Sequence, residues 1–253
     1  MLNFCANLSL LFRELPLLER FGAAGECGFA AVEIQSPYEL PAATVAAAAR
    51  DAGVSVVLIN APMGEQFGRA CRPEAAEQFR SDLERAAEYA AALGAPQVNV
   101  LAGSVAGAER ACLDHLAASL SQAAEVLAAA AARPLLEVLN PLDMPGYCVG
   151  DFELAAQLLG RCDARVGLQF DIYHAARLGL DPAAAFTRHL PRIAHVQFAD
   201  CPGRHEPGTG TLDFGGIFRI ISESGYRGWV GAEYHPSGAT AASLGWLRPV
   251  VRV

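Results

Sequence analysis

The chain has 253 residues, 53% of them hydrophobic, so it can bury a complete core, and its length matches the roughly 250 residues of a single α/β barrel. Its formal net charge is -8, its pI is about 5.2, and no stretch is strongly basic. This balance argues against a nucleic-acid partner, because binding to a phosphate backbone relies on clustered lysines and arginines. The seven cysteines are scattered with no C-x-x-C pair, so we expect reduced thiols and a cytoplasmic location.

No membrane partner is expected either. Charged residues interrupt the alanine-rich segments "TVAAAARDAG" and "AEVLAAAAARP" well before the ~20 apolar residues that a spanning helix needs. The first residues, "MLNFCANLSLLFRELP", have no basic start and carry charge early, which is not typical of a signal peptide.

From the N-terminus onwards, short apolar runs typical of strands alternate with longer stretches typical of helices. The eight expected strands are 3–8, 31–35, 54–60, 97–101, 134–139, 166–170, 194–198 and 229–234. The expected helices are 16–27, 42–52, 74–93, 108–132, 151–162, 182–189 and 214–224, and "ASLGWLRPVVRV" should form a short last helix and a tail. Glycine follows several helices, in "ECGF", "DAGV", "ALGA" and "ESGY", as is common where a helix ends in a left-handed residue.

This order of elements predicts a parallel sheet, and eight repeats favour its closure. We therefore expect an α/β fold, a (β/α)8 TIM barrel in one domain over residues 1–253. The rival, an open doubly wound sheet, usually carries G-x-G-x-x-G after its first strand, and that fingerprint is absent. The glycine-rich "HEPGTGTLDFGG" comes after the seventh strand and is interpreted as a mobile loop over a site.

Polar residues stand near the C-terminal ends of the last four strands, where barrel enzymes have their active sites. Any one of them alone would as readily be a surface or salt-bridged residue, but four on successive strands favour a site. Carboxylates beside apolar runs are costly to bury without a positive charge, and oxygen ligands suit hard cations. We predict a divalent metal, Mg²⁺ or as an alternative Mn²⁺, at Glu137, Asp171, Gln197 and Glu233.

Two further residues are candidates for contacts with a substrate. His174 follows Asp171 by three residues and comes within reach of the same barrel mouth. Arg204 lies in the loop after the seventh strand, where a guanidinium can clamp a carboxylate. The plainer interpretations are a core histidine and a solvated loop arginine. His195 is interpreted as a packed, hydrogen-bonded side chain beside the site.

Two glutamates that flank a divalent cation suggest a particular reaction. The cation acidifies the C–H bond next to a carbonyl, while one glutamate removes a proton and the other returns one. The result is an aldose–ketose isomerisation, or an epimerisation if the proton returns to the same carbon. The same geometry with more histidines and several zinc ions would cut phosphodiesters, but this chain is acidic and has few histidines at strand ends.

Six segments together resemble the hydroxypyruvate isomerase family of xylose-isomerase-like TIM barrels, in the family's order and over nearly the whole chain. They are "FCANLSLLF", "ALGAPQVNVLAG", "LLEVLNPLDMPGY", "LQFDIYH", "HVQFADCPGRHEPGTGTLDF" and "GYRGWVGAEYHP". The resemblance implies that Glu137 and Glu233 are the proton donor and acceptor, and that with Asp171 and Gln197 they surround a divalent metal, usually Mg²⁺. By similarity to the related sugar 3-epimerases, His174 and Arg204 would contact the substrate.

The activity implied is the conversion of hydroxypyruvate to 2-hydroxy-3-oxopropanoate (tartronate semialdehyde) in glyoxylate metabolism, and the family's habit allows a homo-oligomer. The 3-epimerases carry histidine in place of Gln197, which favours the hydroxypyruvate branch. The alternatives are an isomerase of a four-carbon 2-oxo acid, a ketose 3-epimerase, a metal phosphodiesterase like the apurinic endonucleases, and a sugar-acid binding barrel without activity.

The chain departs from the family at several positions that bear on its substrate. The stretch "NAPMGEQFGRACRPEAAEQF" is a few residues shorter than the glycine-rich, basic loop usual there, and "EVLN" replaces Glu-Pro-x-Asn. His205 stands where glycine is common, and His235 where a longer basic residue is common. None of these changes removes an expected ligand.

Overall fold

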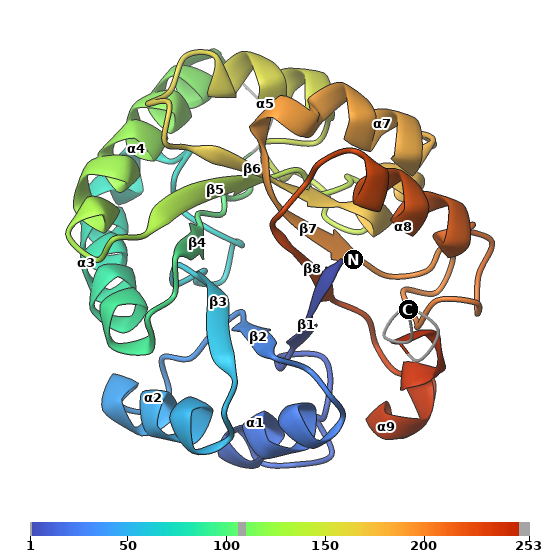
Figure 1. Ribbon diagram of the computed structural model, residues 1–253. Helices are drawn as coiled ribbons and strands as arrows, with labels where there is room; N and C mark the ends of the chain where they lie inside the picture. Colours follow the sequence, from blue (N-terminus) through green and yellow to red (C-terminus); the bar gives the residue numbers. More distant parts are fainter. Residues whose placement is uncertain (1, 106–109, 248–253) are drawn as a thin grey trace.

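The structure, a computed structural model, describes residues 2–105 and 110–247. Eight parallel strands form a closed barrel in the order β1 to β8, and helices surround it (Figure 1), which confirms the (β/α)8 prediction. The strands are β1 (Asn3–Asn7), β2 (Ala31–Ile34), β3 (Ser55–Asn60), β4 (Gln97–Asn99), β5 (Arg133–Glu137), β6 (Gly167–Asp171), β7 (Ile193–Phe198) and β8 (Trp229–Ala232).

The helices mostly follow the expected pattern. They are α1 (Leu17–Glu26), α2 (Ala42–Asp51), α3 (Ala76–Leu93), α4 (Arg110–Ala128), α5 (Phe152–Leu159), α6 (Ile172–Arg177), α7 (Pro182–His189), α8 (Phe214–Glu223) and α9 (Thr240–Ser243), with 3₁₀ turns η1 (Pro73–Ala75), η2 (Leu190–Arg192) and η3 (Leu244–Leu247). The glycines expected to end helices do so, for example Gly94 after α3 with a φ of 65°. Among the described residues, no helix is long and apolar enough to cross a membrane.

Three helix predictions need correction. Helix α4 ends at Ala128, four residues before the expected end, and the expected start at 108–109 lies outside the described residues. The last helix, α9, begins at Thr240, before the segment assigned to it, and most of the expected tail, 248–253, is likewise outside the described residues. Helix α6 was not predicted, because six residues are too few to show a helical period.

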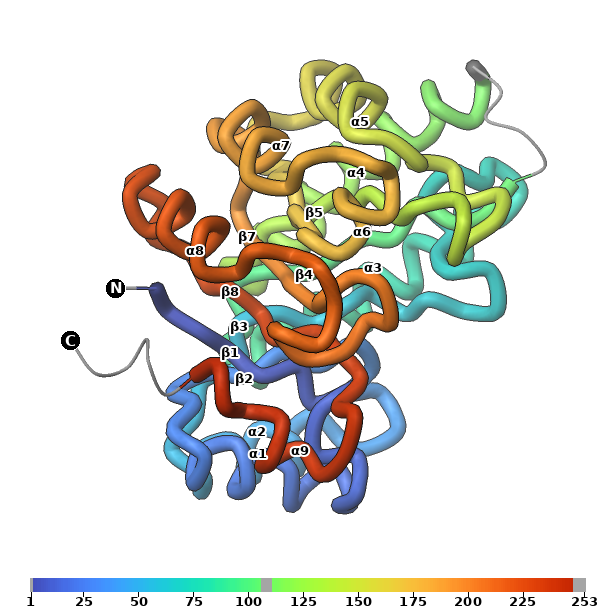
Figure 2. Tube along the Cα trace, turned by 90° about the vertical axis from the view of Figure 1, so that its right-hand side faces the viewer, coloured from blue at the N-terminus to red at the C-terminus, as the bar shows by residue number. Residues whose placement is uncertain are grey.

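The interior of the barrel is apolar at one end and polar at the other. Cys5, Ala31 and Val57 form a small apolar cluster inside the barrel. The main hydrophobic core is separate and lies between the strands and the helices. Figure 2 shows β1 running away from the N-terminus on the left, so the loops that follow the strands lie on the right. The polar strand ends meet under these loops, as expected for a barrel enzyme.

The strand register brings the predicted site residues together. Glu137 of β5 pairs with Gln169 of β6, and Asp171 at the end of β6 pairs with Gln197 of β7. Asp171 also begins α6, since its side chain accepts a hydrogen bond from the Tyr173 backbone N–H at 2.7 Å. The short helix therefore fixes the position of His174 relative to Asp171.

Candidate active site

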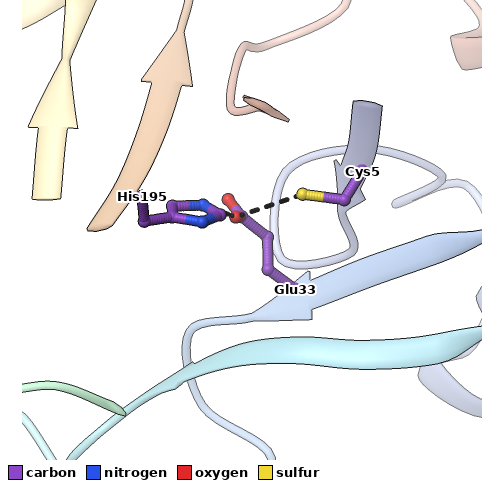
Figure 3. A group of neighbouring side chains, drawn as sticks. All are labelled: Cys5, Glu33 and His195. Carbon is purple, nitrogen blue, oxygen red and sulfur yellow. Dashed lines mark hydrogen bonds and ion pairs between the residues drawn. The ribbon is translucent and has the colours of Figure 1, made fainter. Parts of the chain in front are cut away.

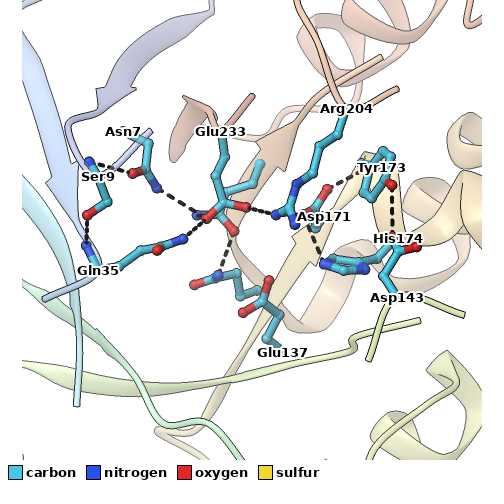
Figure 4. Close-up of polar contacts among 12 residues, drawn as sticks. Asn7, Ser9, Gln35, Glu137, Asp143, Asp171, Tyr173, His174, Arg204 and Glu233 are labelled. Atoms are coloured by element: carbon cyan, nitrogen blue, oxygen red, sulfur yellow. Dashed lines mark hydrogen bonds and ion pairs between the residues drawn. The ribbon is translucent and has the colours of Figure 1, made fainter. Parts of the chain in front are cut away.

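Glu233 follows β8 directly and is 4% exposed. Its Oε1 accepts hydrogen bonds from three side-chain amides, those of Gln35 at 2.8 Å, Asn7 at 3.1 Å and Gln197 at 3.2 Å. Its Oε2 accepts one from Arg204 Nη2 at 2.7 Å. Figure 4 shows Asn7 and Gln35 on one side of Glu233 and Arg204 on the other. One carboxylate oxygen is thus held by amides, and the other meets the guanidinium.

The second glutamate, Glu137, is the last residue of β5 and is 5% exposed. Its Oε2 accepts a hydrogen bond from Asn99 Nδ2 at 2.7 Å. Burial raises its pKa well above the usual range, and the charges of Glu233 and Asp171 add to the rise. Burial likewise raises the pKa of Glu233 to about 7, although Arg204 opposes the shift. The pKa of Glu233 suits that group to exchange protons near neutral pH.

Asp171 and Arg204 lie beside Glu233. Arg204 Nη2 is 3.9 Å from Asp171 Oδ2, and its guanidinium lies 5.1 Å from the centre of the Tyr173 ring. Tyr173 donates a hydrogen bond to Asp143 at 2.8 Å, which fixes the ring. Arg204 is only 25% exposed, and the surrounding carboxylates outweigh the effect of burial and raise its pKa. Arg204 therefore lies among the acids at the strand ends, and its contact with a substrate stays a prediction.

His174 is 1% exposed and holds a defined tautomer. The Asn140 backbone N–H donates to His174 Nδ1 at 3.1 Å, so Nδ1 is an acceptor and the hydrogen resides on Nε2. Nε2 lies 3.6 Å from Asp171 Oδ2. Burial, with Arg204 nearby, lowers the pKa of His174 to about 3, so the ring is neutral near pH 7. His174 therefore offers a hydrogen-bond donor to the site.

Gln197 is buried in β7 next to Glu233, but its amide nitrogen is the atom that faces the carboxylates. Nε2 donates to Glu33 Oε1 at 2.7 Å as well as to Glu233, while Oε1 accepts from Gln169 Nε2 at 2.6 Å. As positioned, Gln197 is a hydrogen-bond donor to the acids. Its carbonyl would serve a metal only after the amide turned round.

The donor set at the barrel mouth fits a divalent cation. Glu137, Asp171 and Glu233 are all buried, and among the described residues Arg204 is the one guanidinium that contacts Asp171 and Glu233. Asp171 Oδ2 is buried and has no hydrogen-bond partner among the residues that the structure describes. One carboxylate oxygen of Glu137 and one of Asp171 lie within 4.8 Å of each other, and a ring nitrogen of His174 lies within the same distance of both. An excess of buried negative charge and an unpaired carboxylate oxygen are what a hard cation would compensate.

We expect Glu233 to contribute less to the stability of the metal-free protein as the pH rises towards neutral, and Mn²⁺ to offset this loss. The pKa of Glu233 rises on folding from its ordinary 4.5 to about 7, so its contribution is fully present below about pH 4.5 and is lost as the pH rises through 7. The full shift corresponds to about 3 kcal/mol. Thermal melts between about pH 5 and pH 8 should show a larger Mn²⁺-induced rise in Tm at the higher pH.

The matched control for this measurement is Glu233→Gln, which cannot titrate at this position. The apo stability of the unchanged protein relative to that of Glu233→Gln should therefore fall as the pH rises through 7. An equal pH dependence in both proteins would contradict the assignment of the shifted pKa to Glu233.

The loop after β7 is held in place by hydrogen bonds to Asp200, a residue that was not predicted from the sequence. Asp200 is fully buried, and its carboxylate accepts hydrogen bonds from the backbone N–H groups of Cys201, Gly208 and Leu212 at 2.8, 2.8 and 3.2 Å. Arg204 has a left-handed φ of 57°, and its carbonyl accepts a hydrogen bond from the His235 N–H. These bonds aim the Arg204 side chain at Glu233.

A cavity of about 170 Å³ opens over the two glutamates. Gln35, His174 and Arg204 contribute polar groups to its wall, whereas Phe67 and Met144 contribute apolar ones. Its volume is suited to a small polar molecule.

The sequence analysis missed four polar residues from the first half of the barrel. Asn7, Gln35 and Asn99 hydrogen-bond the two glutamates, and Glu33 of β2 lies below them. Each stands in or just after an expected strand, so the strand-end rule used for the second half would have found them. His195 is fully buried and hydrogen-bonded, as expected, and its partner is Glu33.

The chain is similar to known proteins over almost its full length. The model of the family described as xylose isomerase-like TIM barrel matches residues 21–250. The 2-oxo-tetronate isomerase of Cupriavidus necator is 38% identical, with 98% of this chain and 98% of that protein covered. The hydroxypyruvate isomerase of Escherichia coli (strain K12) is 36% identical, covering 98% of this chain and 99% of that one.

A solved structure from Brucella melitensis, described as an AP endonuclease of family 2, is similar with a TM-score of 0.95 and 36% identity, over 98% of this chain and 99% of that chain. Fold, sequence and family model agree. The chain therefore belongs to the xylose isomerase-like TIM barrel family.

Proposed function

We propose that this isomerase interconverts hydroxypyruvate and 2-hydroxy-3-oxopropanoate by proton transfer between Glu137 and Glu233. The observation that carries the proposal is the pair of buried glutamates with raised pKa values at one small cavity. Full-length similarity to a protein named hydroxypyruvate isomerase supports the choice of substrate. A cytoplasmic location is part of the proposal, in keeping with seven free cysteines.

In this mechanism, one glutamate removes a proton from C3 of hydroxypyruvate, and the enediolate that results is protonated at C2 by the other. The hydroxyl proton at C3 moves to the oxygen at C2, so that C3 becomes the aldehyde and C2 the secondary alcohol. Glu137 and Glu233 both line the cavity, as two-sided proton transfer requires. Both groups have little contact with bulk solvent, and this low-dielectric surrounding strengthens their electrostatic interactions with a substrate.

Arg204 and His174 would bind and orient the substrate. Arg204 bears five N–H donors, of which one pairs with Glu233, so others are available to a substrate carboxylate. His174, neutral with its hydrogen on Nε2, would donate to a hydroxyl or carbonyl oxygen. A neutral donor supports an oxygen on which negative charge develops without protonating it outright.

The divalent metal belongs to the same proposal, with Mg²⁺ expected and Mn²⁺ as the alternative. Glu137, Asp171 and Glu233 would hold it through carboxylate oxygens, and Gln197 would be the fourth ligand if its amide turned to present the carbonyl. When bound, the ion would supply positive charge that polarises the substrate carbonyl and stabilises the enediolate. The cation would give a partner to Asp171 Oδ2, which accepts no hydrogen bond among the described residues.

A four-carbon 2-oxo acid is the second candidate substrate, because the 2-oxo-tetronate isomerase of Cupriavidus necator is 38% identical over 98% of both chains. The same residues would act on either acid, since both place a carboxylate, a carbonyl and a neighbouring hydroxyl carbon in a row. A ketose 3-epimerase would act on a longer sugar, and the cavity of about 170 Å³ favours the shorter acids.

Phe67 is expected to limit the length of the substrate. It lines the active-site cavity and also a neighbouring cavity of about 580 Å³, with Met144 beside it in both. Phe67→Ala should join the two spaces and raise kcat/KM for five- and six-carbon ketoses relative to hydroxypyruvate by about tenfold. Leu142→Ala, at a hydrophobic residue that is 65% exposed, is the control and should leave the ratio unchanged. An unchanged ratio in Phe67→Ala would mean that another wall sets the limit.

The proposal is tested by proton NMR of hydroxypyruvate and 2-oxo-tetronate in D₂O with purified protein and Mg²⁺ or Mn²⁺. Formation of 2-hydroxy-3-oxopropanoate with deuterium incorporated supports the first function, and turnover of the four-carbon acid alone supports the second. Deuterium exchange without product would indicate enediolate chemistry on a different substrate.

Two functions of another class have distinct signatures in the same samples. A phosphodiesterase like the apurinic endonucleases would cleave abasic DNA and bind several zinc ions, whereas this chain has a formal net charge of -8. A sugar-acid binding barrel without activity would bind hydroxypyruvate and exchange no deuterium. Either result would overturn the isomerase proposal.

A further inference from the structure

Beneath the two glutamates, a further carboxylate lies wholly inside the barrel. Glu33 of β2 and His195 of β7 are both 0% exposed, and His195 Nε2 is 2.6 Å from Glu33 Oε2. Figure 3 shows Glu33 between His195 and Cys5, whose Sγ lies 3.6 Å from the same oxygen. The proton transfer proposed above makes no use of this group.

The carboxylate of Glu33 is held from several directions at once. Oε1 accepts hydrogen bonds from Asn7 Nδ2 at 2.8 Å and Gln197 Nε2 at 2.7 Å, and Oε2 meets His195. The barrel leaves room for it at Gly231 of β8, where a Cβ would stand 2.5 Å from Glu33 Oε2. A carboxylate with this many donors acts as an acceptor with a single orientation.

The same two amides that hold Glu33 also hold Glu233. Asn7 Nδ2 and Gln197 Nε2 reach Glu233 Oε1 at 3.1 and 3.2 Å, so each NH₂ group can give one hydrogen to each carboxylate. Asn7 cannot turn round freely, because its Oδ1 accepts the Ser9 backbone N–H at 3.0 Å. Two amide bridges therefore join Glu33 to Glu233 and occupy the Oε1 side of Glu233.

Cys5, Glu33 and His195 also bear ligand atoms within 4.8 Å of one another, which could suggest a second metal. The hydrogen bonds argue against this interpretation. An ion would have to displace the 2.6 Å contact between His195 and Glu33 in a place with no exposed surface. A positioning role requires no such change.

We propose that Glu33, anchored by His195, is a positioning residue that fixes Glu233 through Asn7, so that Glu233 Oε2 is directed at the cavity. Gln197 adds a second bridge as long as its amide nitrogen faces the two acids. Its catalytic consequence rests on the proposed function, since Glu233 is the proton-transfer group there. Groups that orient a ligand or catalytic side chain typically contribute 10- to 100-fold to metal affinity or activity.

Glu33→Gln is the first test, because it keeps the shape of the side chain but removes its charge and replaces one of its two acceptor oxygens with an NH₂ donor. At saturating Mn²⁺, kcat per folded molecule should fall about 10- to 100-fold. KM should change little, because neither His174 nor Arg204 contacts Glu33. Mn²⁺ affinity, measured by calorimetry, should weaken about tenfold, since Glu233 is a proposed ligand.

Asn7→Ala is the second test, and it leaves the pair of Glu33 and His195 in place should Glu33→Gln fail to fold. It should lower kcat in the same direction, and the double variant should lose less than the sum of the two single losses in free energy, because both act through one bridge. Cys5→Ala is the matched control, because Cys5 contacts Glu33 and not Glu233. Its kcat should equal that of the unchanged protein.

A merely structural role gives a different pattern. Glu33→Gln and Asn7→Ala would then lower Tm and the folded fraction, but kcat per folded molecule and Mn²⁺ affinity would be unchanged, and the proposal would be overturned. Strict additivity in the double variant would overturn it as well. If the unchanged protein turns over neither acid, the proposed function fails, and Mn²⁺ affinity still decides whether Glu33 positions Glu233.

Discussion

Glu137→Gln and Glu233→Gln are each expected to lower kcat by about 10²- to 10⁴-fold, the contribution typical of a general acid or base. The raised pKa values of the two glutamates favour their neutral, protonated form. Glutamine is also neutral and has the same shape, so the buried site should tolerate it. What it lacks is a proton to exchange. The measurement is kcat on hydroxypyruvate and 2-oxo-tetronate, with circular dichroism to verify folding.

Deuterium exchange in these variants would show which glutamate removes the proton from C3 and which one protonates C2. The variant that retains the base at C3 should still exchange the C3 hydrogens with D₂O without forming product, whereas the other should not. Glu74→Gln, at a side chain that is 64% exposed, is the control and should have unchanged kcat. Substantial turnover in either active-site variant would sink the two-glutamate mechanism.

Removal of divalent metal is expected to abolish turnover, and Mg²⁺ or Mn²⁺ to restore it. Without a cation, three buried carboxylates share the charge of Arg204, and ionising all of them is unfavourable. The measurement is activity after chelation and dialysis, with the metal content determined by elemental analysis. Asp171→Asn should weaken Mn²⁺ affinity about 10- to 100-fold, because it replaces the carboxylate that has an unpaired oxygen.

The chelated protein should remain folded, which circular dichroism would verify, since the barrel core does not include the cluster of acids. Undiminished activity in a sample shown to contain no divalent metal would contradict the metal prediction and leave Arg204 as the principal cation near the reacting atoms.

The alternation of short apolar runs and helical stretches was enough to predict the barrel and its eight strands. Period and punctuation are local properties, and they recur eight times, so errors of one or two residues at strand ends did not change the topology. Helix α6 was not predicted, because about one and a half turns are too short to show a helical period in the sequence. Its start also depends on a hydrogen bond to the side chain of Asp171.

At the site, the sequence by itself determined which residues stand at the ends of the last four strands, because a parallel barrel brings every strand end to one rim. Glu137, Asp171, Gln197 and Glu233 do meet there. Their roles as ligands and catalysts stay predictions.

Only the tertiary structure decided how these side chains are paired. Glu33 and Glu233 are 200 positions apart in the chain, yet two amides join them, and the direction in which Gln197 points follows from its hydrogen-bond partners across the barrel. Likewise, Arg204 reaches Glu233 because buried Asp200 ties down its loop. Hydrogen-bond partners and desolvation depend on distances between strands that no local pattern encodes, which is why the pKa values and the orientation of the site emerged only from the folded chain.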